Sequence, residues 1–212
     1  MQISLNPTSH VLFIGDSITD CGRMSLLRPL GDGFVSLIGR RLKKMIPSCR
    51  ITNRGVCGDR VSDMASRWKE DCIEVKPTTV SILIGINDTW RRYDQGMETT
   101  VEEFEEHIRD TLNRTVTGLG ADLVICEPFL LPMSDEQKLW SIDFNPKRRL
   151  LRGLAEEYGA VFVPLHEKFL KAAAISGASM LVTDGVHPTR KGHELIASAW
   201  LENVTDEVCA YS

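Results

Sequence analysis

Four short blocks of this chain carry residue types that, in combination, could transfer an acyl group. They are residues 15–19 (GDSIT), 53–59 (NRGVCGD), 85–88 (GIND) and 184–188 (DGVHP). The blocks supply a serine hydroxyl, amide groups that can stabilise an oxyanion, and a histidine with a carboxylate nearby. Each block alone has an ordinary use in turns and helix caps, so the prediction of a nucleophilic serine depends on their joint occurrence.

Ser17 is the candidate nucleophile. It follows the apolar segment 11–14 and two turn-forming residues, Gly15 and Asp16. A turn at the end of a buried strand exposes the hydroxyl, and the amide of Ser17 can then face the reacting carbonyl. The alternative is that Asp16 or Ser17 only caps a helix, which is a common use of both residue types.

Gly58 and Asn87 are the candidate oxyanion donors beside the amide of Ser17. Gly58 lies in a Gly-x-x-Gly turn, where the missing Cβ lets an amide approach a ligand, and Gly55 competes for the same role. Asn87 follows a segment rich in β-branched residues, and its side-chain amide can donate to an oxyanion. Ordinary turns, including an Asx-turn at Asn87, are the alternative for both positions.

Asp184 and His187 are the candidate carboxylate and general base. A carboxylate at this spacing on a tight loop can hold one imidazole nitrogen, so that the other nitrogen faces outward to take a proton. The chain order Ser…Asp…His also occurs in other serine hydrolases. A surface loop with a turn-forming Asp-Gly pair is the alternative. The other histidines form no pair or carboxylate cluster with metal-ligand spacing, so we expect no metal site.

The rest of the sequence predicts the elements that must position these blocks. Apolar runs alternate with amphipathic segments, which is typical of a parallel sheet with helices on both faces. The predicted strands are 11–14, 50–52, 79–84, 121–126 and 161–163, and the predicted helices are 34–45, 61–72, 101–118, 147–158, 165–174 and 191–201. Residues 128–146 are predicted to be irregular. Three blocks directly follow a strand, so they should meet at the carboxyl edge of the sheet, where open parallel sheets bind ligands.

Length and composition are those of an ordinary globular protein. The chain has 212 residues, 42% hydrophobic and 25% charged, which suits one α/β domain spanning residues 1–212. Its net charge is -4 and its Lys and Arg are spread along the chain, so we expect no nucleic-acid partner. No apolar stretch approaches the ~20 residues of a membrane span. Residues 1–7 lack the regions of a signal peptide, so we expect no membrane partner and a cytoplasmic location.

The 6 cysteines of the chain form no C-x-x-C pair and therefore suggest no zinc site. Without a leader peptide, reduced thiols are the expected state. Cys21 and Cys57 lie close in sequence to the candidate site, where they could be reactive bystanders.

Together, the four blocks resemble those of the SGNH (GDSL-type) hydrolase superfamily. The family's Ser in GDS, turn Gly, Asn in GxND and His in DxxHP correspond to Ser17, Gly58, Asn87 and His187. By this resemblance Asp184 is the third member of a catalytic triad, and Gly58 is preferred to Gly55 because the family's glycine usually precedes Asp or Asn. The resemblance covers residues 15–188. It implies a three-layer, flavodoxin-like α/β fold with a five-stranded parallel sheet, and no cofactor.

Residues 13–23 and 84–91 show a narrower resemblance, to the small intracellular bacterial acetyl xylan esterases of that superfamily. Those enzymes remove acetyl groups from xylo-oligosaccharides. The resemblance implies a serine carboxylic-ester hydrolase whose partner is a small acylated substrate, an acetylated oligosaccharide. Thr183 departs from this group, in which a tryptophan is expected before the aspartate, and this departure bears on sugar specificity.

Asp16, Trp90, Arg91 and Tyr93 are the candidate substrate-binding residues. The last three follow closely after Asn87, so part of this segment should border the mouth of the site. An indole can pack on the C–H face of a sugar, and an arginine can donate to its hydroxyls. The alternative is that Trp90 packs beneath the loop and Arg91 holds neighbouring carbonyls.

Two other functions remain open on the sequence alone. The same catalytic parts would serve a lysophospholipase or acyl-thioesterase, with Leu130, Leu131 and Trp140 of the irregular segment lining a groove for a long acyl chain. A catalytically inactive hydrolase fold that acts as a binding protein is the other, and the complete set of catalytic residue types argues against it. The sequence leaves the oligomeric state open, including a homo-oligomer.

Overall fold

The computed structural model describes residues 2–24 and 28–205 of the chain. They form one parallel sheet of five strands in the order β2-β1-β3-β4-β5. The strands are β1 (His10–Gly15), β2 (Arg50–Gly55), β3 (Thr79–Leu83), β4 (Asp122–Cys126) and β5 (Val161–Val163). The predicted α/β class with a five-stranded parallel sheet is therefore confirmed.

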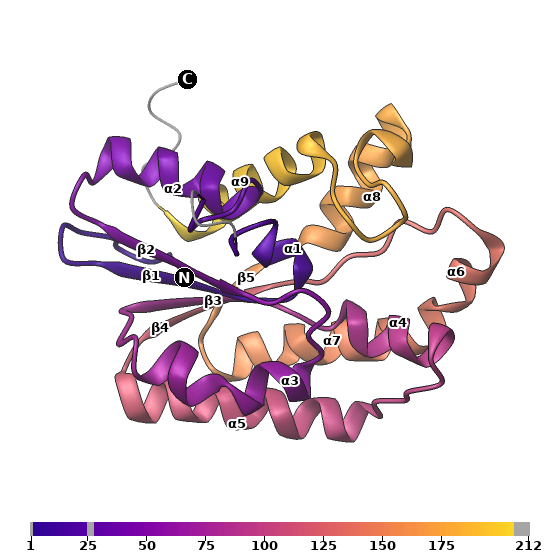
Figure 1. Cartoon of the computed structure of the whole chain (residues 1–212), viewed down its shortest axis with the longest axis horizontal. Helices are drawn as coiled ribbons and strands as arrows, with labels where there is room; N and C mark the ends of the chain where they lie inside the picture. The colour runs from indigo at the N-terminus through magenta and orange to yellow at the C-terminus, as the bar shows by residue number, and fades with distance from the viewer. Residues whose placement is uncertain (1, 25–27, 206–212) are drawn as a thin grey trace.

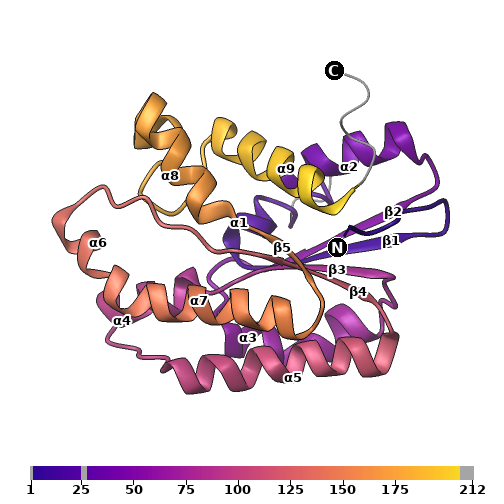
Figure 2. The same ribbon diagram turned by 180° about the vertical axis from the view of Figure 1, so that it is seen from behind.

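Helices cover both faces of the sheet and make three layers (Figure 1). One face carries α2 (Phe34–Met45), α8 (Leu165–Ser176) and α9 (Arg190–Val204), and the other carries α3 (Val61–Ser66), α5 (Val101–Leu119) and α7 (Ser141–Glu157). Three further helices, α1 (Ser17–Asp20), α4 (Ile86–Asp94) and α6 (Asp135–Leu139), lie toward the carboxyl ends of the strands. Figure 2 shows the same layers from behind, with α6 beyond the sheet and next to α4 and α7.

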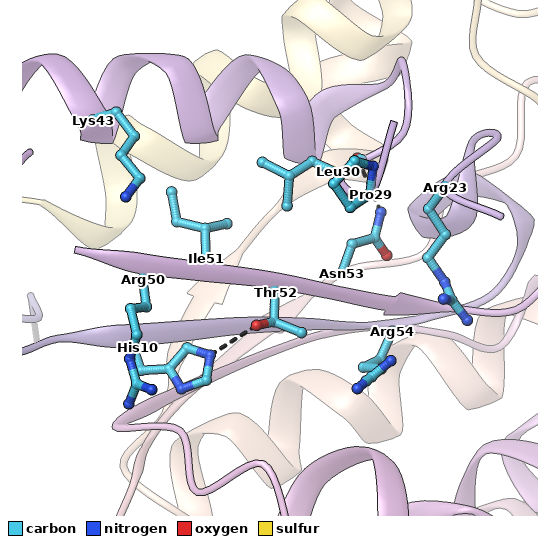
Figure 3. A pocket seen from close by; sticks show the side chains of 10 residues that line it. All are labelled: His10, Arg23, Pro29, Leu30, Lys43, Arg50, Ile51, Thr52, Asn53 and Arg54. Atoms are coloured by element: carbon cyan, nitrogen blue, oxygen red, sulfur yellow. Dashed lines mark hydrogen bonds between the residues drawn. The ribbon is translucent and has the colours of Figure 1, made fainter. Parts of the chain in front are cut away.

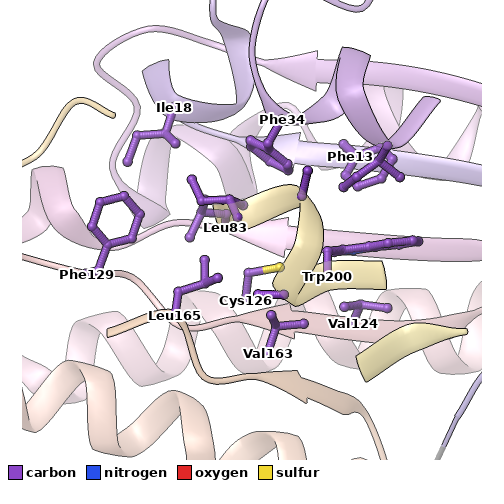
Figure 4. Packing of buried hydrophobic residues seen from close by; sticks show 14 of the residues in the cluster. Phe13, Ile18, Phe34, Leu83, Val124, Cys126, Phe129, Val163, Leu165 and Trp200 are labelled. Carbon is purple, nitrogen blue, oxygen red and sulfur yellow. The ribbon is translucent and has the colours of Figure 1, made fainter. Parts of the chain in front are cut away.

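The core lies on both sides of the sheet because side chains of each buried strand alternate between its faces. Phe13 belongs to the cluster on one face, and Leu12 and Ile14 belong to the cluster on the other. Around Phe13, the rings of Phe34 and Trp200 lie 5.9 and 5.3 Å away between centroids (Figure 4). These contacts join α2 and α9 to β1, so two helices of this layer hold the strand that ends two residues before Ser17.

Most predicted elements match the observed ones, and two predictions need correction. The helix predicted at 61–72 is interrupted: α3 ends at Ser66, and a π-helical turn, Lys69–Ile73, follows. The segment predicted to be irregular, 128–146, contains α6 and the first residues of α7. Pro146 lies inside α7, where a proline removes one backbone donor but does not end this helix, because buried Phe144 and Lys147 hold it to the protein.

A buried ion pair on α7 ties this helix to α4. Lys147 Nζ lies 2.6 Å from Asp143 Oδ2, and the two side chains are only 1% and 6% exposed. The same carboxylate accepts hydrogen bonds from Thr89 Oγ1 at 2.7 Å and Arg92 Nη1 at 2.9 Å. Removing the Asp143 carboxylate would therefore take this acceptor from Lys147, Thr89 and Arg92 at once.

We expect Asp143→Ala to lower the free energy of unfolding by about 3–5 kcal/mol, because Lys147 would be left as an unpaired buried charge. Urea unfolding followed by circular dichroism measures this loss. Asp135→Ala is the matched control, because it removes an ion pair with Lys138 whose side chains are 96% and 68% exposed. That control should cost less than about 1 kcal/mol. Equal losses in the two variants would contradict a structural role for the buried pair.

Candidate active site

The first block forms a sharp turn between β1 and α1. β1 ends at Gly15, and a Cβ built on this residue would lie 2.0 Å from the carbonyl oxygen of Leu83. Asp16 then caps α1, because its Oδ1 accepts a hydrogen bond from the amide of Ile18 at 2.9 Å. Ser17 is the first residue of the helix and is partly exposed. The turn thus places the serine hydroxyl at the carboxyl edge of the sheet.

Ser17, His187 and Asp184 form a continuous hydrogen-bonded chain. Ser17 Oγ lies 3.0 Å from His187 Nε2, and His187 Nδ1 lies 2.6 Å from Asp184 Oδ2. An ionised carboxylate can only accept, so Nδ1 carries the proton of the neutral ring and Nε2 is left to accept from the serine hydroxyl. This is the arrangement of nucleophile, base and orienting carboxylate that acyl transfer requires.

Asp184 also organises its own loop. Its Oδ1 accepts hydrogen bonds from the amides of Val186 at 3.0 Å and His187 at 2.7 Å. Burial by itself would raise the pKa of Asp184, but these amide bonds and the bond from the His187 ring hold that pKa below its ordinary value. The carboxylate is therefore ionised at neutral pH, as its place beside the imidazole requires.

Asn87 links the second and third blocks. It is the second residue of α4, it is buried, and its Nδ2 donates to the backbone carbonyl of Asp59 at 3.0 Å. One of the two Nδ2 hydrogens is used in this bond, and the other is free to donate elsewhere. Because Asp59 directly follows Gly58, this bond holds the Gly58 turn next to the Asn87 side chain.

The neighbouring carboxylate of Asp88 holds the start of α3, which follows the Gly58 turn in the chain. Its two oxygens lie 3.3 and 3.1 Å from the amide of Val61, the first residue of α3. Burial raises the pKa of Asp88 to about 6. Sequence reasoning missed this residue as an anchor, because its partner is a backbone amide that no pattern identifies.

The two competing glycines have different surroundings. A Cβ built on Gly55 would lie 2.2 Å from the amide nitrogen of Asp20, so Gly55 is required where α1 packs on the end of β2. A Cβ built on Gly58 would meet nothing within 4 Å, and Gly58 has a φ of +87°. Gly58 therefore borders open space, whereas the amide of Gly55 already donates to Asn53 Oδ1 at 2.8 Å, which favours Gly58 over Gly55 as an oxyanion donor.

Asp16, a candidate substrate-binding residue, lies almost entirely away from solvent. It is 1% exposed, and burial together with the nearby carboxylates of Asp88 and Asp59 raises its pKa to about 7. Its hydrogen bond with Ile18 places it in the turn that presents Ser17. In this position the carboxyl group of Asp16 supports the turn that carries Ser17 and is not accessible to a substrate.

Aromatic rings border the imidazole of His187. The ring of Trp90 lies 5.6 Å from that of His187 and 5.7 Å from that of Trp140, measured between centroids. Tyr93 stacks on Trp140 at 5.5 Å, and its hydroxyl donates to the carbonyl of Leu139 at 3.0 Å. Trp90 thus faces the site, whereas Tyr93 supports Trp140 from behind.

Arg91 lies beside Trp90, with its guanidinium carbon 5.6 Å from the centre of the indole ring, and it forms an ion pair with Asp94. The distance fits a cation–π contact. Trp90 is partly exposed, so part of its surface is free beside His187.

The apolar residues of the segment after β4 do not line an open groove. Leu130, Leu131 and Trp140 are all buried and belong to the core. The apolar surface expected to receive a long acyl chain is therefore already used for packing.

The described cysteines are all free thiols: Cys21, Cys49, Cys57, Cys72 and Cys126. Cys57 is exposed, Cys21 Sγ lies 3.4 Å from His193 Nε2, and Cys209 lies outside the described residues.

Within residues 2–24 and 28–205, no group of three His, Cys, Asp or Glu side chains is arranged to hold a metal ion. In the same part of the chain, no helix has the length and apolar character to cross a membrane.

A separate groove of about 590 Å³ runs along β2, one of the two edge strands of the sheet (Figure 3). None of the predicted site residues lines it, and half of its lining residues are basic. Those basic residues are His10, Arg23, Lys43, Arg50 and Arg54. The groove is thus distinct in composition and position from the site that contains Ser17 and His187.

We expect Gly55→Ala to destabilise the protein strongly, because the added methyl group would meet the backbone of α1. Gly58→Ala should be tolerated better, since only the left-handed backbone, worth about 1–2 kcal/mol, opposes it. Thermal unfolding of the two variants measures the difference. A larger loss of melting temperature for Gly58→Ala would mean that the two glycines have the opposite roles.

Comparisons with known proteins show the family of this chain. The profile of the GDSL-like lipase/acylhydrolase family matches residues 13–195. An acetylxylan esterase from Geobacillus stearothermophilus is 34% identical over 208 residues, which cover 92% of this chain and 93% of that protein.

Solved structures of similar proteins support the same family assignment. A protein from Parabacteroides merdae named as a GDSL-like lipase superposes with a TM-score of 0.90 at 35% identity, covering 96% of this chain and 98% of its own. An acetylxylan esterase from Geobacillus stearothermophilus superposes with a TM-score of 0.87 at 32% identity, covering 98% of this chain and 100% of its own. Because the family profile spans most of the chain and its relatives align along nearly their whole length, the chain belongs to the GDSL-like lipase/acylhydrolase family and is a serine ester hydrolase.

Proposed function

We propose that this serine ester hydrolase removes acetyl groups from carbohydrates, xylo-oligosaccharides in particular, through an acyl-enzyme on Ser17. The hydrogen-bonded chain from Ser17 through His187 to Asp184 carries the chemical part of the proposal. The acetylxylan esterase that is 34% identical over nearly the whole chain supports the substrate class.

In the first half of the reaction, Ser17 Oγ attacks the acetyl carbonyl carbon while His187 Nε2 takes the hydroxyl proton. The carbonyl oxygen becomes an oxyanion, which accepts hydrogen bonds from the amides of Ser17 and Gly58 and from Asn87 Nδ2. When the tetrahedral intermediate collapses, the bond to the sugar oxygen breaks, and His187 gives its proton to that oxygen.

The second half uses the same groups in reverse order. A water molecule loses a proton to His187 Nε2 and attacks the acetyl-serine carbonyl, and the same donors hold the second oxyanion. Breaking the ester bond to Ser17 Oγ releases acetate and returns the proton to the serine. Asp184 keeps the ring in one tautomer and stabilises its protonated form throughout. Protein groups supply nucleophile, base and donors, so the proposed mechanism uses no metal or cofactor.

Two features near His187 support a small acyl group on a sugar. Trp90 offers part of an indole face beside the imidazole, and such a face packs on sugar C–H groups. The burial of Leu130 and Leu131 leaves no apolar groove from these residues for a long acyl chain. Thr183 is exposed on the loop before Asp184 and cannot supply the aromatic contact expected of a tryptophan there. In the proposed function, Trp90 makes the aromatic contact with the sugar.

We expect Ser17→Ala to remove nearly all turnover, by about 10⁶ in kcat, with the fold intact, because the nucleophile is lost. Hydrolysis of an aryl acetate, with circular dichroism as the check on folding, measures this. A fluorophosphonate should label the wild-type chain at Ser17 stoichiometrically. Labelling at a different serine would falsify the assignment of the nucleophile.

We expect Trp90→Ala to raise KM for acetylated xylo-oligosaccharides about twofold to tenfold, as loss of ~0.5–1.5 kcal/mol of aromatic contact implies. Hydrolysis of a small aryl acetate and the melting temperature should barely change. Trp90→Phe, which keeps a ring beside His187, should restore part of the binding. If both substrates and the melting temperature decline together, Trp90 is structural, and a general short-chain esterase becomes the better description.

A further inference from the structure

In the loop 184–187, both carboxylate oxygens of Asp184 bind groups of the loop itself. Contacts from other parts of the protein must therefore hold the loop in place. Oδ1 accepts from two amides of the loop, and Oδ2 accepts from the ring of His187. The backbone carbonyls of Asp184 and Gly185, by contrast, accept from outside the loop. Their donors are Gln137 Nε2 at 2.6 Å and the amide of Leu131 at 2.9 Å. Both donors belong to the segment between β4 and α7.

The orientation of the Gln137 amide is determined by its two partners. Oε1 accepts from the amide of Met133 at 2.8 Å, and Nε2 donates to the carbonyl of Asp184 at 2.6 Å. A backbone amide can only donate and a backbone carbonyl can only accept, so one orientation of the side chain satisfies both. A glutamate at this position could satisfy both only when it is protonated.

The loop is also shaped to receive this side chain. Gly185 has a φ of +93°, and a Cβ built on it would lie 2.6 Å from Gln137 Oε1 and 3.0 Å from Gln137 Nε2. The glycine therefore leaves the space that the Gln137 amide occupies. The contact is specific in shape as well as in hydrogen bonding.

Buried groups hold the segment that carries Gln137 at both of its ends. At the start, Glu127 is fully buried and accepts from Arg148 Nη1 at 2.6 Å and the amide of His166 at 3.1 Å. At the end, Trp140 is buried and stacks with Tyr93. Gln137 thus connects a fixed part of the protein to the loop that presents His187.

From these contacts we propose that Gln137 is a positioning residue, which holds the Asp184–His187 loop so that Nε2 of His187 stays within reach of Ser17. The proposal rests on the proposed function, in which His187 is the general base. The side chain of Gln137 bonds to the backbone of Met133 and Asp184 and not to the side chain of Ser17 or His187, so its loss should act on kcat through the geometry of the loop. It should leave KM close to the wild-type value.

Gln137→Met tests this, because methionine has similar length and cannot form either hydrogen bond. We expect kcat to decrease roughly tenfold to a hundredfold, as small displacements of catalytic groups do, with KM within about twofold. Lys138→Met places the same residue one position along the same helix, where the lysine is 68% exposed, and should leave kcat within about twofold of wild type. Equal kcat in Gln137→Met and wild type, or equal losses in both variants, would overturn the proposal.

Gln137→Glu adds a readout that a general loss of structure would not move. Below its pKa the glutamic acid can donate to the Asp184 carbonyl, whereas above it the carboxylate repels that oxygen. The ratio of variant to wild-type kcat should therefore decrease as pH rises from 5 to 9. A ratio that does not change with pH would contradict the proposed contact.

A measurement without substrate separates this proposal from the proposed function. The proton on His187 Nδ1, in its short bond to Asp184, should give a far-downfield NMR resonance in the wild type and in Lys138→Met. In Gln137→Met this resonance should shift or broaden. An unchanged resonance would overturn the role of Gln137, whereas turnover retained by Ser17→Ala would overturn the proposed function.

Discussion

The site depends on the register of the parallel sheet. Gly15 at the end of β1 pairs with Gly55 of β2 on one side and with Leu83 of β3 on the other. The three strands therefore end at one level, and the blocks that follow them emerge side by side. A side chain on Gly15 would collide with the carbonyl of Leu83, and one on Gly55 with the amide of Asp20. Two glycines in one register thus permit the tight turn that presents Ser17.

The fourth block reaches the site by different means, because it follows no strand. Its position is determined by contacts among loops: the bridge between Val182 and Pro188 closes its base, and hydrogen bonds from Leu131 and Gln137 hold its outer side. Three blocks are thus arranged by backbone pairing within the sheet, and the fourth by two backbone contacts and the side chain of Gln137. The Gln137 contact is more easily disturbed, since a single substitution can remove it.

This difference explains what the sequence could predict. Alternating apolar and amphipathic segments predicted the sheet, and the blocks after its strands predicted their common edge. The helix α4 is not among the predicted elements, because Ile86, Trp90 and Tyr93 are the only apolar residues in this short, mostly polar segment; the sequence therefore places Asn87 after a strand without its helix. Pro146 favours an irregular segment in the sequence, whereas buried Phe144 and Lys147 keep α7 helical around it in the structure. Gln137 carried no signal, since its role comes from a partner 47 residues away.

Two carboxyl groups beneath the site are buried, and their burial lowers the stability of the fold. Asp16 and Asp88 are buried, with pKa values raised to about 7 and about 6. An acid whose pKa is higher in the folded than in the unfolded chain binds more protons when folded. Its contribution therefore destabilises the fold progressively as pH rises from about 4 toward the folded value. Both groups are nonetheless used at the site, since Asp16 caps the helix that begins with Ser17, and Asp88 holds the start of α3, which follows the Gly58 turn. The structure thus keeps two unfavourably buried acids because each fixes a backbone amide next to the proposed catalytic groups, where the placement of donors matters more than stability.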